Sequence, residues 1–175
     1  MKRIPFLFIK RLTRLSWGEA AWGYHNQYIG WVDATDLACD RIVGDEVEPT
    51  VIELAGISKS DASEVGYYLD KLAKGVEYDE KEMKAKWLYL SLAWCFENRA
   101  LLPDPFEAVE EIYSDFEYSE DVAPFVRYMP VTDGYDPSAN SAEENHSRLL
   151  SKWRDYLVIR SPIFADHPKP PSGPL

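Results

Sequence analysis

The chain has 175 residues, which suits one domain, and 46% of them are hydrophobic, which allows a sizeable core. Charged residues make up 28% with both signs present, and this mixture excludes global disorder. The formal net charge of −11 disfavours nucleic acid and anionic membranes as partners, and leaves a basic partner or simple solubility as its explanation.

Helix signals recur along the chain, whereas the alternation typical of strands does not appear. Ser16 with Glu19, and Ser141 with Glu144, have capping-box spacing, and Pro49 stands where a first helical residue is expected. The predicted helices cover residues 17–28, 33–43, 49–55, 58–74, 79–98, 105–116, 119–128 and 141–157. We therefore expect a single all-α domain of about eight helices, with residues 87–96 near its centre.

The two ends of the chain are expected to lie outside this domain. Residues 1–15 form a basic segment, residues 16–160 the helical domain, and residues 161–175 a Pro-rich tail without packing potential. The apolar run at residues 4–9 contains Pro5 and is followed by basic residues, which argues against a signal peptide. No run reaches the length of a membrane span, and we expect a cytoplasmic protein.

The histidines and cysteines carry no pattern typical of chemistry. His25, His146 and His167 lack metal-ligand spacing, and His146 shares a helical face with apolar residues, which favours a packed histidine. Cys39 and Cys95 lie among apolar residues on predicted helices, which favours reduced, buried thiols. No nucleophile elbow, phosphate loop or dinucleotide fingerprint occurs, so we assign no catalytic, cofactor-binding or metal-binding residue. A catalytic set built from residues distant in sequence stays open.

The predicted helix at residues 105–116 separates apolar and acidic faces cleanly. At 100° per residue, Glu107, Glu110, Glu111 and Asp115 fall on one side. The opposite side carries Phe106, Val109, Ile112, Tyr113 and Phe116. Like charges four residues apart cost roughly 0.2–0.5 kcal/mol per pair. Residues 104–121 contain eight acids and no base, which favours a surface for a cationic partner, although an accidental acidic face stays open.

Residues 125–145 form a long connection with oxygen-bearing side chains but no calcium-loop spacing. Gly134 follows Asp133 directly, whereas a calcium loop needs alternating acids with glycine at the sixth position. Pro137 after Asp136 indicates a turn. We expect a structured loop, with Tyr128, Met129 and Tyr135 packed beneath it. Its length, unusual in a compact domain, also suggests a function.

Five strings in order resemble an uncharacterised bacterial family of small acidic proteins. They are SWGEAAWGY (16–24), VIELAG (51–56), KWLYLSLAWCFENR (86–99), DPFEAVEEIYSDFEY (104–118) and FVRYMPVTDGYDPS (125–138). The ordered matches span about residues 17–156, and the basic start lies outside them. Some proteins of this type resemble immunity proteins of contact-dependent-inhibition or polymorphic toxin systems, which are cytosolic and neutralise one toxin by binding it.

The resemblance and the acidic helix together predict a toxin inhibitor without catalysis of its own. We expect a monomer or weak dimer that binds a basic toxin, a nuclease for preference, and covers its active site. The predicted partner-binding residues are Glu107, Glu110, Glu111, Asp115, Asp133, Tyr135 and Asp136. A hydrolase or nucleic-acid-processing enzyme without a recognisable motif, and a non-enzymatic subunit of a larger assembly, are the alternatives.

Overall fold

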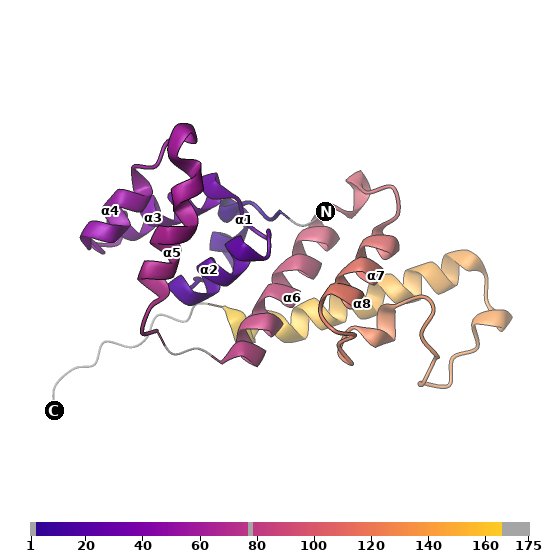
Figure 1. Cartoon of the computed structure of the whole chain (residues 1–175). Coiled ribbons are helices and arrows are strands. Elements are labelled where there is room, and N and C mark those ends of the chain that lie inside the picture. The colour runs from indigo at the N-terminus through magenta and orange to yellow at the C-terminus, as the bar shows by residue number, and fades with distance from the viewer. Residues whose placement is uncertain (1–2, 77–78, 166–175) are drawn as a thin grey trace, which may run out of the picture.

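The computed structural model describes residues 3–76 and 79–165 as a single all-α domain. Within these residues the chain forms eight α-helices, four short 3₁₀ helices and no strand, which confirms the predicted fold class (Figure 1). The α-helices are α1 (Phe6–Leu12), α2 (Trp17–His25), α3 (Trp31–Val43), α4 (Pro49–Ala55), α5 (Val65–Ala73), α6 (Glu80–Glu97), α7 (Pro105–Asp115) and α8 (Ala142–Phe164). The 3₁₀ helices are η1 (Lys59–Glu64), η2 (Arg99–Leu101), η3 (Ala123–Phe125) and η4 (Pro137–Ala139).

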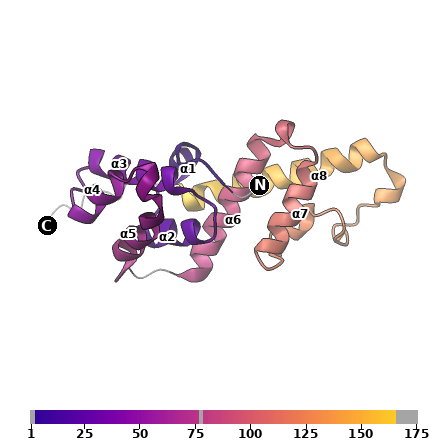
Figure 2. The same ribbon diagram turned by 45° about the horizontal axis from the view of Figure 1, so that its top comes forward.

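The helices form two groups that share α6. Helices α1–α5 gather on one side and α7 lies on the other, with α6 between them in both views (Figures 1 and 2). Trp87 and Leu90 of α6 belong to the core of the first group, whereas Leu92 and Cys95 belong to the second. Residues 87–96 of α6 are apolar except for Ser91, so this part of the helix can be buried from opposite sides.

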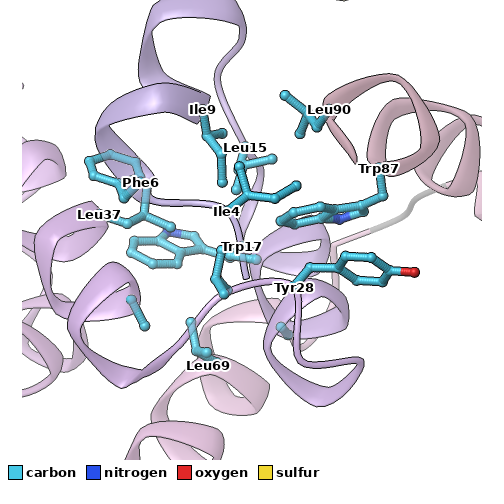
Figure 3. Packing of buried hydrophobic residues seen from close by; sticks show 14 of the residues in the cluster. Ile4, Phe6, Ile9, Leu15, Trp17, Tyr28, Leu37, Leu69, Trp87 and Leu90 are labelled. Atoms are coloured by element: carbon cyan, nitrogen blue, oxygen red, sulfur yellow. The ribbon is translucent and has the colours of Figure 1, made fainter. Parts of the chain in front are cut away.

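In the first core, α2 packs closely against α6. Trp87 is fully buried beside Tyr28, and its indole N–H donates to the carbonyl of Glu19 at 3.1 Å (Figure 3). Gly23 makes this approach possible, because a Cβ there would lie 2.1 Å from Cζ2 of the Trp87 ring. The second core lies between α6, α7, η3 and α8, around the fully buried Trp153.

Both ends of the chain are more structured than expected. Residues 6–12 form α1, whose Phe6 and Ile9 are buried in the first core, so the basic start is not separate from the domain. Lys10 and Arg11 point outward and pair with acids, which satisfies the charge without exposing the apolar face. Helix α8 continues through Pro162 to Phe164, which packs against Tyr89 at a ring distance of 5.3 Å. The predicted tail therefore begins later than residue 161, and its residues 166–175 lie outside the described residues.

Four further expectations need correction. The helix expected over residues 58–74 is η1 followed by α5, and the weak helix over 119–128 is reduced to η3. Pro124 inside η3 explains the second difference, since proline removes a backbone donor. Cys39 is exposed, whereas Cys95 is buried as expected. The ring of His146 contacts Phe106 edge-on at 5.1 Å, but its side chain is exposed rather than packed.

Candidate functional site

Helix α7 is held in one orientation by its cap and its inner face. The side chain of Asp104 accepts hydrogen bonds from the backbone N–H of Phe106 at 2.9 Å and of Glu107 at 3.3 Å, and Pro105 occupies the first turn. The inner residues Phe106, Val109, Ile112 and Tyr113 are buried, and Phe116 is half-buried. The predicted apolar face of this helix is therefore confirmed.

The outer face of α7 carries three exposed acids rather than four. Glu107, Glu111 and Asp115 are exposed, and we call them the α7 acidic face. In the described part of the chain Glu107 has no ion pair. Glu110 differs, because its carboxylate is half-buried and accepts two hydrogen bonds from Arg127, at 2.8 and 2.9 Å.

Arg127 joins α7 to the loop that follows η3. Besides Glu110, the guanidinium donates to Asp104 at 2.6 Å. This hydrogen bond is the main reason that the pKa of Asp104 lies below its ordinary value, and the cap hydrogen bonds act in the same direction. The carboxylates in turn raise the pKa of Arg127. Glu110 is consequently a structural ion-pair partner, and its charge is not offered to a ligand.

The 126–136 loop is braced against α8 by its predicted site residues. Asp133 accepts from Arg148 at 2.7 Å and from Lys152 at 2.7 Å, and these cations hold its pKa well below the ordinary range. The guanidinium of Arg148 lies 4.2 Å from the centre of the Tyr135 ring, and the Tyr135 hydroxyl donates to Asn145 at 2.7 Å. The loop is thus ordered, as predicted, but Asp133 is used internally.

Asp136 also has a local role. Its carboxylate accepts from the hydroxyl of Ser138 at 2.6 Å and from the backbone N–H of Ser138 at 2.9 Å, the second of which caps η4. These two hydrogen bonds, the hydroxyl first, lower the pKa of Asp136. Its side chain remains exposed. The expected packing of Tyr128, Met129 and Tyr135 under the loop is only partly right. Met129 and Tyr135 are half-buried, whereas Tyr128 is 60% exposed.

A cavity of about 560 Å³ opens where α7, the 126–136 loop and α8 meet. Apolar side chains such as Phe106, Val126, Met129 and Leu149 line it, together with Arg127, Arg148 and Lys152. The cavity and its three cations were not predicted from the sequence. The one available signal was the four-residue spacing of Arg148 and Lys152, which places both on one face of α8.

The seven predicted partner-binding residues do not form one continuous site. Asp133, Tyr135 and Asp136 belong to the cavity region, and Arg127 connects Glu110 to it. Glu111 and Asp115 instead flank a small cleft of about 20 Å³ beside Ile4 and Tyr28, at the junction of the two helical groups. Glu107, on the first turn of α7, lines neither the cavity nor this cleft.

Asp115 also affects its neighbour at that junction. Burial, followed by the negative charge of Asp115, raises the pKa of Tyr28 to about 12.

Residues 3–76 and 79–165 contain no group of three or more His, Cys, Asp or Glu side chains that could hold a metal ion. Among the same residues, no helix is long and apolar enough to cross a bilayer.

A protein-family model matches residues 6–161, and the family is described as "Uncharacterized protein conserved in bacteria (DUF2247)". The match begins at residue 6, so the expectation that the basic start lies outside the family resemblance is wrong. No match was found among curated proteins or among solved structures. Because the family model covers most of the chain, the protein belongs to this conserved bacterial family.

Proposed function

We propose that this protein is an immunity protein that binds and neutralises a basic bacterial toxin, preferentially a nuclease, in the cytoplasm. One observation carries the proposal: Glu107, Glu111 and Asp115 are exposed along the outer face of a helix whose inner face is locked in the core. Lysine and arginine are absent from residues 104–121, so α7 itself offers these acids no base at the four-residue spacing of a helical ion pair. Such a face repels itself slightly and favours a cationic partner.

A nuclease must bind phosphate and therefore carries a basic substrate cleft. An acidic protein can be steered to that cleft by long-range attraction and can block it without any catalysis of its own. The rigid mounting of α7 supports this role, because a preorganised surface loses little conformational entropy on binding. The protein would act as a monomer or weak dimer, and the acids would mainly raise the association rate.

The test is co-expression with the toxin domain encoded next to this chain. A triple variant changes Glu107, Glu111 and Asp115 to lysine. A control variant makes the same change in net charge on the other helical group, at the exposed acids Asp36, Glu48 and Glu53.

We expect the wild-type chain and the control to protect cells, and the α7 variant to fail although it folds. Protection by the α7 variant would place the interface elsewhere. If no neighbouring toxin binds the wild-type chain, the proposed function is wrong.

A further inference from the structure

The cavity beside α7 is preformed and of a size that suits a ligand. Its volume of about 560 Å³ lies within the range of roughly 300–1,000 Å³ typical of ligand pockets. One wall is the 126–136 loop, which Asp133 fixes to Arg148 and Lys152. Because these contacts already order the loop, an incoming group would not have to bear that entropic cost.

The floor of the cavity suits a bulky apolar group. Phe106 is buried and packs against Trp153, with ring centres 6.1 Å apart. Met129, opposite on the loop, accepts a hydrogen bond from the Tyr113 hydroxyl at 3.6 Å, and Leu149 of α8 lines the same space. Aromatic and aliphatic side chains gain most by leaving water for such a surface.

The charges at the rim disfavour an anionic ligand. Arg127 is already bonded to Asp104 and Glu110, and Arg148 and Lys152 are bonded to Asp133. An incoming anion would compete with these internal carboxylates, and displacing them would leave half-buried groups such as Glu110 less well paired.

Two exposed glutamates directly follow lining residues in the sequence. Glu107 follows Phe106 on α7, and Glu143 follows Ala142, which lines the cavity at the start of α8. Both glutamates are exposed, and neither has an ion pair among the residues that the structure describes. A basic residue beside an apolar group would therefore find a carboxylate to pair with.

We propose that the cavity is the anchor site for one bulky aromatic or aliphatic side chain of the partner, flanked by lysine or arginine. This inference rests on the proposed function and deepens it, since it names the partner feature that is recognised. Buried aromatic anchors in preformed pockets, surrounded by polar contacts, commonly dominate the affinity of protein interfaces. The α7 acidic face would then set the rate of association, and the cavity the lifetime of the complex.

The experiment uses short peptides with blocked ends, so it needs no toxin. Lys-Trp-Lys, Glu-Trp-Glu and Lys-Ala-Lys are titrated into the ¹⁵N-labelled chain, and the amide signals of Phe106, Val126 and Leu149 are followed. A cavity-filling variant, Ala142→Trp, is compared with Ala139→Trp, whose exposed position lies outside the cavity lining. Circular dichroism checks that both variants fold.

We expect Lys-Trp-Lys to shift these signals, Glu-Trp-Glu to bind at least about tenfold more weakly, and Lys-Ala-Lys to leave them unchanged. Ala142→Trp should abolish the Lys-Trp-Lys shifts, and Ala139→Trp should retain them. The proposal is overturned if Glu-Trp-Glu binds equally well, if Lys-Ala-Lys shifts the same signals, or if no peptide does. Self-association that Ala142→Trp removes would assign the cavity to a second copy, and would also overturn it.

The two proposals fail in different ways. Peptide binding in the cavity together with unprotected cells would contradict the immunity function alone. Protection of cells with no peptide binding would contradict the anchor site alone.

Discussion

Gly23 marks the closest approach between α2 and α6, and Gly23→Ala should destabilise the protein. Alanine in a helix interior normally gains about 0.5–1 kcal/mol over glycine. Here the new Cβ would lie 2.1 Å from Cζ2 and 2.6 Å from Cη2 of Trp87, closer than any real contact. Trp87 is fully buried and bonded to the Glu19 carbonyl, so it cannot move freely. Overpacking of this kind costs about 1–3 kcal/mol or more, which exceeds the gain.

Gly66→Ala is the matched control for this substitution. A Cβ at Gly66 in α5 would meet Cε1 of His25 and Cε1 of Tyr24 at 3.5 Å, an ordinary contact. The helix preference should then act alone and raise the free energy of unfolding by up to about 1 kcal/mol. Urea unfolding of the two variants and the wild-type chain gives the free energy of unfolding of each, provided that its dependence on urea concentration is the same for all three. A Gly23→Ala variant as stable as Gly66→Ala would refute the packing argument.

Three further predictions concern the cap, the core and the thiols. Asp104→Asn keeps the helix cap but loses the ion pair with Arg127, so it should lower the free energy of unfolding. Asp104→Ala also removes the cap and should lower the free energy of unfolding by about 0.5–2 kcal/mol more than Asp104→Asn does. Because Arg127 lowers the folded-state pKa of Asp104, the stabilisation is present above its ordinary value of 3.8 and is lost as pH falls through the lower folded value. The difference in free energy of unfolding between wild type and Asp104→Asn, measured with urea, should therefore be smaller at pH 3 than at pH 7. An unchanged difference would contradict the ion pair. Ile112→Ala should cost about 2–5 kcal/mol in the same assay, and a neutral effect would argue against burial of the inner face of α7. Burial raises the pKa of the Cys95 thiol to about 11, whereas Cys39 is exposed. A thiol reagent at pH 8 should therefore label only Cys39 in the folded chain, and both cysteines after unfolding. Rapid labelling of both cysteines in the folded chain would contradict the burial of Cys95.

The helices could be predicted because their signals are local. Ser16, Asp104 and Ser141 accept hydrogen bonds from first-turn amides, as their positions before apolar periodic segments predict. Pro49 occupies the first turn of α4 for the same local reason. The inner face of α7 likewise follows from a 3.6-residue period within one segment.

Tertiary pairing could not be predicted in the same way. Arg127 lies outside the acid-rich segment 104–121, and only the path of the chain through η3 brings it to Glu110. The pairing of Asp133 with α8 depends similarly on how the loop folds back. These contacts pair two of the seven predicted site residues internally and fix the loop that forms one wall of the cavity. The position of that wall is not indicated by any spacing within a single segment.

Helix α1 was not predicted, because residues 1–15 were interpreted from their basic charges and the apolar spacing of Phe6 and Ile9 was not taken as a helix signal. Phe6 and Ile9 are three residues apart and face the core, whereas Lys10 and Arg11 lie on the outside. Pro5 precedes the helix rather than interrupting it, a position where proline is tolerated.

The central claim is that the α7 acidic face steers a basic toxin onto this protein. The most direct test is the association rate constant for the adjacent toxin domain at low and high salt, measured for wild type, the Glu107/Glu111/Asp115 triple lysine variant and the Asp36/Glu48/Glu53 control. We expect the α7 variant to associate at least about tenfold more slowly than the control at low salt, with the difference narrowing as salt screens the charges. Equal rates for the two variants at low salt would contradict the account.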